Sequence, residues 1–510
     1  MPEITKTETS KPVAGYVWLM LAATAIFVYF LGLNIPFVGP DEPRYAQVAR
    51  EMLERGDWIT PTLGGYSWFE KPPLLYWLEM VSYKLFGVSE FAARLGPALF
   101  GLGTIASLWI LGRSVERSTK SDHRQTNGLA NWLALVAAST LGIIVFSHGA
   151  SFDIIITFPV TAALVSFFIF DQSKHASFGK RDLPLLLFYV FSGIALLAKG
   201  LIGIIFPLSI VGCFFLFSRR RPGRTFVLSL LWGTFVAITI ASVWYLPMYW
   251  RHGYQFVDEF FVQHHFQRFV SNKYQHPQPF YFFFWVLPLM TLPWLPFFLA
   301  SIWACARKWF RRTSAASRLP FSPSPLPLFA ASWLLVPLVF FSFSGSKLPG
   351  YILPALPGAV ILTSIFIFCL IESSTKGGNF ILVIATSTFV TTALLLVLTA
   401  PRFAEFESVR TLIHVANEHG YSSNRVLMLH TISHNAEFYA AGRLLRDTDG
   451  KQRRLSGVGE VLTEINAENG QPVLVLVPLE YLSQLTADEK LKTEVLKDNG
   501  ELAIAAVSTR

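Results

Sequence analysis

The feature that most constrains this chain is a series of long apolar stretches that recurs up to about residue 400. A run of about 17 to 25 mostly apolar residues is long enough to cross a bilayer as a helix. The chain is 52% hydrophobic and only 15% charged, too apolar for a set of water-soluble domains. We predict an α-helical polytopic membrane protein with about 11 transmembrane helices. The predicted spans are 14–33, 91–111, 129–146, 154–170, 183–198, 201–217, 226–248, 281–304, 326–343, 351–370 and 380–399.

Basic residues are concentrated in alternate loops, and this pattern predicts which loops face the cytoplasm. Lys and Arg flanking short loops remain on the cytoplasmic side of a membrane. With the N-terminus inside, dense basic clusters such as 219–224 and 307–318 all lie inside. Topology and contacts with anionic membrane lipids therefore explain the net charge of +9, and we predict no nucleic-acid partner. The segments predicted to lie outside are 34–89, 147–153, 199–200, 249–280, 344–350 and the tail after residue 400.

The first outer loop, 34–89, is too patterned to be a simple connection. From Tyr45, apolar residues recur at spacings of three and four, as on one face of an amphipathic helix lying in the membrane interface. Pro72 and Pro73 suit the start of a second such helix. We therefore expect two interfacial helices that bracket Asp41 and Glu70.

A change of composition near residue 400 predicts two domains, a transmembrane domain at 1–400 and a soluble outer domain at 401–510. Short apolar runs at 425–430 and 473–477 are of strand type, and helix-compatible sequence follows each of them. We expect a small α/β domain. It contains no phosphate-binding glycine loop and no metal-spaced Cys/His set.

Among the acidic residues of the predicted outer loops, the candidates for a function are Asp41, Glu42, Glu70 and Asp153. Carboxylates near the membrane are energetically costly and are commonly functional. Each could act as a general base, a metal ligand or the partner of a cation, or alternatively as a helix cap. Asp153 stands at a predicted helix start, where a carboxylate also suits the helix dipole. Asp41 is the preferred candidate for chemistry, with Glu42 and Asp153 as further catalytic candidates.

The candidate cations on the outer side, where the positive-inside rule gives no reason for them, are Arg44, Lys71, Lys199, Arg268 and Lys347. Any one of them could be a snorkelling side chain. Together they would suit a phosphate at headgroup depth, because Arg forks onto phosphate oxygens and Lys supplies a point charge.

A phosphate site and a carboxylate base on one membrane face suggest sugar transfer from a polyprenyl-phosphate carrier. Attack at the anomeric carbon would expel a lipid phosphate that the cations stabilise, while Asp41 takes the acceptor proton. An alternative is a transporter or flippase of lipid-linked sugars, which would carry its charges near the midplane in broken helices. A third interpretation is a membrane-anchored binding or assembly protein, which would not need Asp41 and Lys71 in one loop.

Several motifs resemble the GT-C membrane glycosyltransferases of the protein O-mannosyltransferase type, and among them the bacterial 4-amino-4-deoxy-L-arabinose transferases that modify lipid A. The long block GPDEPRYAQVAREMLERGDWITPTLGGYSWFEKPPLLYWLEM is the most specific. FGVSEFAARLGPALFG, HHFQRF followed by PFYFFFWVLPLMTLPW, and SGSKLPGYILPALP add to the resemblance. The motifs cover less than a third of the chain, and none lies in the tail.

The resemblance implies a polyprenyl-phosphate-sugar donor, a lipid, glycan or protein acceptor, and a multi-pass location in a bacterial inner membrane with the site on the periplasmic face. It implies Asp41 as the catalytic carboxylate. It also implies phosphate contacts from Arg44, Lys71, Lys199 and Lys347, and a cavity wall containing Tyr45, Glu70 and Tyr351. No cofactor is required by it, although Glu70 and His265 could hold a divalent cation, since carboxylate and imidazole suit zinc.

Overall fold

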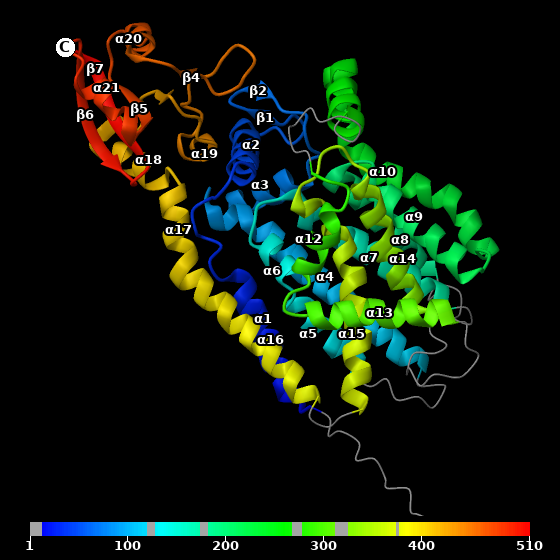
Figure 1. The fold of residues 1–510 in the computed structure, drawn as a ribbon. Helices are drawn as coiled ribbons and strands as arrows, with labels where there is room; N and C mark the ends of the chain where they lie inside the picture. The colour runs from blue at the N-terminus through cyan, green and yellow to red at the C-terminus, as the bar shows by residue number, and fades with distance from the viewer. Residues whose placement is uncertain (1–12, 120–127, 174–181, 268–277, 312–324, 374–376) are drawn as a thin grey trace, which may run out of the picture. The chain divides into compact units, whose positions relative to one another are not determined.

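The computed structural model describes residues 13–119, 128–173, 182–267, 278–311, 325–373 and 377–510 (Figure 1). Within these ranges six helices are long and apolar enough to cross a membrane, and a bent pair, Leu129–Ala138 and Leu141–Ser147, would be a seventh. The prediction of a multi-pass membrane protein is confirmed. Shorter apolar helices coincide with further predicted spans, but their length does not decide whether they cross, so the count of about 11 stays a prediction.

The contacts within the chain divide it into two compact units. The helical unit contains the described residues up to Leu31 together with Glu70–Leu75 and Gly96–Ala393. The mixed unit contains Gly32–Phe69, Tyr76–Leu95 and Leu394–Arg510. Parts of the first outer loop thus share a unit with the C-terminal residues, which the sequence alone did not indicate. The predicted domain boundary at residue 400 stays a prediction.

The helical unit is built around α7 (Phe152–Gln172), which packs against α8 (Asp182–Lys199) and α9 (Ile202–Ser218). α7 is apolar on all sides and largely buried, as expected for the central helix of a membrane bundle. The other elements of this unit are α1 (Gly15–Phe30), most of α4 (Glu90–Thr119), α5 (Leu129–Ala138), α6 (Leu141–Ser147), α10 (Arg224–Val257), the π-helix η2 (Asp258–Gln267), α12 (Phe282–Met290), α13 (Leu295–Arg311), α14 (Leu326–Ser342), the 3-10 helix η3 (Pro349–Ala355), α15 (Leu356–Ser373) and most of α16 (Gly377–Leu394).

Aromatic side chains fill the centre of this bundle. The ring of Phe167 on α7 lies within about 6 Å of the rings of Phe188 on α8 and Phe329 on α14, with centroid distances of 5.9 and 6.1 Å. Small residues allow the closest helix approaches. A Cβ added to Gly203 on α9 would lie 2.3 Å from the Ala195 carbonyl carbon of α8, so only glycine fits there.

Two predicted interfacial helices are present. α2 (Asp41–Arg55) ends at Gly56, whose φ of 64° is the left-handed conformation that glycine adopts most easily. α3 (Leu74–Phe86) follows the two prolines, as predicted. Between them the strands β1 (Thr62–Leu63) and β2 (Tyr66–Ser67) form a small antiparallel hairpin.

The C-terminal part of the mixed unit contains a five-stranded sheet in the order β4-β3-β5-β7-β6. β3 (Val426–Leu429) is parallel to β4 (Arg454–Leu455) and β5 (Val473–Pro478), whereas β7 (Leu502–Thr509) is antiparallel to β5 and to β6 (Leu491–Asp498). Alternate residues of β3 and β5 enter two separate apolar clusters, so both faces of the sheet are covered. The predicted small α/β fold and its strands β3 and β5 are confirmed. The remaining elements here are η4 (Leu395–Thr399), α17 (Ala400–Glu407), α18 (Arg410–Ala416), η5 (Asn417–Tyr421), α19 (Ala436–Tyr439), α20 (Val458–Ala467), η6 (Leu479–Tyr481) and α21 (Leu482–Thr486).

Candidate functional site

The candidate residues fall into two groups, one in each unit. Asp41, Glu42, Arg44 and Tyr45 belong to the mixed unit. The helical unit contains Glu70, Lys71, Asp153, Lys199, Lys347 and Tyr351. Arg268 lies outside the described residues, as does the side chain of His265, whose backbone is part of η2.

Asp41 is the first residue of α2, where the helix dipole favours a carboxylate. Its Oδ1 accepts a hydrogen bond of 2.6 Å from Nη2 of Arg44, one helical turn further on. Arg44 also donates from Nε to the carbonyl oxygen of Pro40 at 2.8 Å and lies over the ring of Trp68. The side chain of Asp41 is 47% exposed, so a substrate can reach it.

The adjacent acid has a different environment. Glu42 accepts two hydrogen bonds from Arg94 of α4, one from Nε at 3.0 Å and one from Nη2 at 2.7 Å. The side chains of Glu42 and Arg94 are 15% and 5% exposed, respectively. A buried bidentate pair of this kind fixes geometry strongly. Its pairing gives Glu42 a structural role, and its assignment as a catalytic acid stays a prediction.

Arg94 also holds the chain that leads into α2. Its guanidinium donates to the carbonyl oxygens of Leu33, Ile35 and Pro36, and it stacks over the ring of Phe37 at 5.0 Å. The guanidinium of Arg94 therefore fixes both the start of α2 and the segment before it. Asp41 lies between these two attachment points in the sequence.

The C-terminal part of the chain contributes to the same neighbourhood within the mixed unit. α19 packs against α2, and its Tyr439 hydroxyl accepts from the backbone N–H of Phe37 at 2.9 Å and donates to Glu90 at 2.9 Å. Two residues before α19, His434 is electrostatically coupled to both Asp41 and Arg44. Partial burial, together with the positive charge of Arg44, lowers the pKa of His434, so its imidazole is neutral near pH 7.

In the helical unit, Asp153 and Lys199 form an ion pair between the first turn of α7 and the last turn of α8. The ammonium of Lys199 also lies 4.8 Å from the centre of the Tyr351 ring, a cation–π contact. Three of the predicted residues are thus brought together although they are far apart in the sequence. Both side chains of the ion pair are mostly buried, with exposures of 17% and 14%.

Gly350 makes this arrangement possible. A Cβ at residue 350 would lie 1.9 Å from Oδ2 of Asp153 and 2.7 Å from Cε1 of Phe146. Any larger residue would therefore displace the carboxylate that holds Lys199. Gly350 stands in the motif SGSKLPGYILPALP, but nothing in the sequence indicates this role.

Lys347 precedes Gly350 in the same loop and is almost fully buried, with an exposure of 6%. Its ammonium donates to the carbonyl oxygens of Ser344 at 2.6 Å and Gln278 at 3.1 Å. Burial lowers the pKa of Lys347 from its ordinary value. Its partners in the described part of the chain are thus neutral carbonyls, and a buried ammonium with such partners retains a strong attraction for an anion.

Glu70 and Lys71 are neighbours joined by an ion pair of 2.6 Å, and both side chains are largely buried. Within the ranges that the structure describes, no group of three or more His, Cys, Asp and Glu side chains is arranged to hold a metal ion. The two-ligand metal site at Glu70 and His265 stays a prediction, because the side chain of His265 is not among the described ones.

Arg94, His434 and Gly350 are the site residues that sequence analysis missed. Arg94 was present in a quoted motif, and a single arginine within an otherwise apolar stretch is a usable signal for a buried ion pair. No comparable signal marks His434, because its relation to α2 depends on the folding of the C-terminal part.

Comparison with known proteins supports the resemblance seen in the motifs. Residues 18–260 match the family model described as dolichyl-phosphate-mannose-protein mannosyltransferase. The chain is 32% identical to an undecaprenyl phosphate-alpha-4-amino-4-deoxy-L-arabinose arabinosyl transferase of Aeromonas hydrophila, over 64% of this chain and 56% of the relative. With the protein of the same description from Serratia proteamaculans it shares 31% identity, over 70% of this chain and 60% of the relative. The chain thus spans less than two thirds of the length of these curated relatives.

The fold is similar to that in the crystal structure of ArnT from Cupriavidus metallidurans bound to undecaprenyl phosphate. The TM-score is 0.78, with 23% sequence identity, and the match covers 97% of this chain and 98% of that one. At this identity the likeness establishes the fold. The fold and the sequence matches together confirm the resemblance: the chain has the GT-C membrane fold and is similar in sequence to the protein O-mannosyltransferase family and to the aminoarabinose transferases.

Proposed function

We propose that the chain is a membrane glycosyltransferase that moves a sugar, most simply a pentose, from a polyprenyl-phosphate carrier to an acceptor hydroxyl or phosphate. The curated relatives are named as transferases of aminoarabinose from undecaprenyl phosphate, which supports this donor class. We place the reaction at the periplasmic face of a bacterial inner membrane, with lipid A or another envelope glycan as acceptor.

The observation that carries the proposal is the contrast between two adjacent acids. Glu42 is held by the buried Arg94, whereas the Asp41 carboxylate is nearly half exposed. A general base must reach the acceptor proton, and only an accessible carboxylate can do so. Asp41 is therefore assigned as the base, and Arg44 holds one of its oxygens so that the carboxylate keeps one orientation.

The reaction then balances without a cofactor. The acceptor oxygen attacks the anomeric carbon, its proton passes to Asp41, and the bond from the anomeric carbon to the carrier phosphate oxygen breaks. The lipid phosphate leaves with the bonding electron pair. Its negative charge increases in the transition state, where cations fixed in a water-poor site stabilise it most effectively.

We assign the donor phosphate to the cations of the helical unit. Lys199 is oriented by Asp153 and Tyr351, and Lys347 is buried with neutral carbonyl partners, so each holds its charge in a fixed place. We propose three further phosphate contacts, namely Arg44, Lys71 and Arg268. Of these, Lys71 forms an ion pair with Glu70. In this scheme Asp153 acts by positioning Lys199, while Tyr45, Glu70 and Tyr351 belong to the cavity wall.

His434 is proposed to contact the acceptor. The charges of Arg44 and Asp41 both act on the pKa of His434, and a neutral imidazole can both donate and accept hydrogen bonds. This gives the C-terminal domain a function in selecting the acceptor.

The test is transfer by the purified protein with undecaprenyl-phosphate-linked aminoarabinose and lipid A, followed by mass spectrometry of the product. Asp41→Asn is expected to lower transfer by at least about a hundredfold with an unchanged Tm, the scale of a lost general base. Glu54→Gln makes the same chemical change at an exposed position of the same helix and should retain activity. Transfer by Asp41→Asn at the wild-type rate would overturn the assignment of the base.

A further inference from the structure

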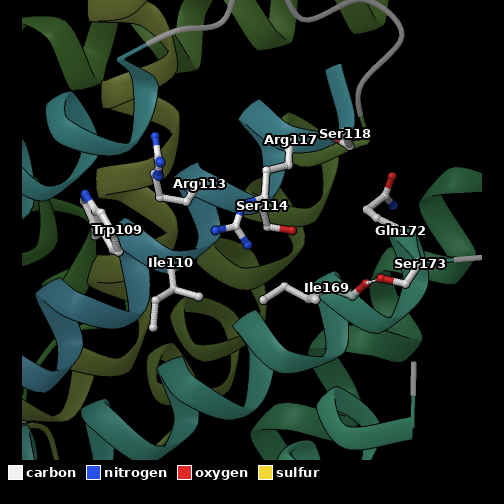
Figure 2. A pocket seen from close by; sticks show the side chains of 9 residues that line it. All are labelled: Trp109, Ile110, Arg113, Ser114, Arg117, Ser118, Ile169, Gln172 and Ser173. Atoms are coloured by element: carbon white, nitrogen blue, oxygen red, sulfur yellow. Dashed lines mark hydrogen bonds between the residues drawn. The ribbon is translucent and has the colours of Figure 1, made fainter. Parts of the chain in front are cut away.

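A cavity of about 430 Å3 in the helical unit lies apart from every candidate residue described above. It is lined by the C-terminal part of α4 and the end of α7 (Figure 2). The lining residues are Trp109, Ile110, Arg113, Ser114, Arg117, Ser118, Ile169, Gln172 and Ser173. Its size is sufficient for a phosphate-containing headgroup.

The position of this cavity along α7 places it at the opposite membrane surface from the Asp153–Lys199 pair. Asp153 is in the first turn of α7, and Gln172 is its last residue. At 1.5 Å per residue these two ends are separated by about 28 Å, which matches the hydrocarbon thickness of a bilayer. The cavity therefore lies at the headgroup level of the other leaflet, which the basic loops identify as the cytoplasmic one.

The lining that the described residues form contains two cations and no acid. Arg113 and Arg117 are one helical turn apart on α4, and Figure 2 shows the Arg117 side chain extending toward the space between α4 and α7, beside Ser114. Arg113 is partly engaged, because its Nη1 donates to Glu116 at 2.9 Å and its guanidinium stacks on Trp109. Among the described residues no acid pairs with Arg117.

Two described acids, Glu116 and Asp171, are adjacent in sequence to lining residues, and both have other partners. Glu116 is buried and its Oε1 accepts from the backbone N–H groups of Gly128 and Ala130, at 3.0 and 2.9 Å. Asp171 on α7 pairs with Arg220 at the end of α9. Neither charge is therefore available to Arg117, and the described lining retains a positive charge that attracts an anion.

Apolar surface continues from the cations toward the lipid. Trp109 and Ile110 line the cavity and are 41% and 47% exposed, although both are large apolar residues in a membrane helix. Exposed apolar side chains in such a helix face acyl chains. A free phosphate would use the guanidinium groups alone, whereas a phospholipid would also cover Trp109 and Ile110.

We propose that this cavity binds the phosphate of an anionic phospholipid from the cytoplasmic leaflet, with Arg117 and Arg113 on the phosphate and Trp109 and Ile110 beside the acyl chains. Basic cavities between transmembrane helices on the cytoplasmic side are suited to such headgroups. The bound lipid would hold the ends of α4 and α7 together. This site is independent of the proposed transfer reaction.

The test measures thermal stabilisation of the full chain in detergent while lipid is added. Phosphatidylglycerol should raise the Tm, and phosphatidylcholine should do so much less. Arg117→Gln is expected to weaken the apparent affinity for phosphatidylglycerol by about tenfold, the effect of losing one charge-assisted contact. Arg221→Gln, an exposed arginine outside the cavity lining, is the matched control and should respond like the wild type.

A second variant, Ser114→Leu, fills the cavity without changing its charge and should also reduce the phosphatidylglycerol effect. Equal stabilisation by inorganic phosphate or glycerol phosphate would show that the ligand is a soluble phosphate and would overturn the assignment to a lipid. The same response in Arg117→Gln, Ser114→Leu and Arg221→Gln would overturn the site itself. Because the readout is the Tm, the result does not depend on transfer activity.

Discussion

Arg94 binds the Glu42 carboxylate through two hydrogen bonds, of 3.0 and 2.7 Å, while the same guanidinium reaches the carbonyl oxygens of the segment before α2. Asp41, the proposed base, lies in the sequence between these two attachments. This relationship separates two acids that are adjacent in sequence: one carboxylate is used to fix the backbone and the other remains accessible for chemistry.

Arg94→Gln should therefore lower both stability and transfer. Removing one partner of a buried ion pair costs about 3–5 kcal/mol, because the other charge is left buried. The Tm should fall, and kcat measured well below the Tm should fall more than the donor KM changes, since Asp41 loses its fixed position. A double variant with Glu42→Gln should regain much of the Tm, because no unpaired charge remains. Additive losses in the double variant would contradict the pairing.

Gly350→Ala is expected to impair donor binding strongly and to lower the stability of the fold only moderately. The added Cβ would meet Oδ2 of Asp153 at 1.9 Å, so the carboxylate must move away from Lys199. Overpacking of this kind costs about 1–3 kcal/mol in stability. The donor KM, measured with labelled lipid-linked sugar, should rise. Gly212→Ala on α9, where a Cβ meets nothing within 4 Å, should leave the KM unchanged.

Glu79 gives a prediction about stability and pH. It is fully buried in α3, and neither carboxyl oxygen has a hydrogen-bond partner among the described residues. Burial, and next the charge of Glu42, raise the pKa of Glu79 well above its ordinary value. Above pH 4.5 the unfolded chain loses this proton while the folded chain keeps it, so stability falls as pH rises, by about 1.4 kcal/mol per pH unit.

Glu79→Gln removes this penalty. The Tm of the variant should exceed that of the wild type at pH 7.5, by about 2–4 °C for each kcal/mol. The difference should shrink steadily as the pH is lowered toward 4.5, because the carboxyl of the unfolded chain then also becomes protonated. Thermal shift measurements between pH 4.5 and 8 check this, and a constant difference over that range would contradict a buried neutral acid.

The local parts of the site follow from the sequence, whereas the nonlocal parts do not. The spacing of apolar residues after Tyr45 predicts α2, and two prolines predict the start of α3. By contrast, Arg94 is 52 positions from Glu42, and nothing in the periodicity of α4 marks its partner.

The strand β6 was not predicted for another reason. Most of its residues are at least partly exposed, so it lacks the apolar run that revealed β5.

His434 supplies the last prediction, a change in the pH dependence of transfer. Partial burial and Arg44 lower its pKa below 6.5, with Glu437 and Asp41 acting in the opposite direction. As pH falls through that pKa, the new positive charge competes with Arg44 for Asp41 and weakens the base, so transfer should decrease on the acidic side. His434→Gln should remove this acidic limb and raise the acceptor KM several-fold with little change in Tm. His414→Gln, an exposed histidine in the same unit paired with Glu418, is the control. An unchanged pH profile in His434→Gln would refute an acceptor-side role.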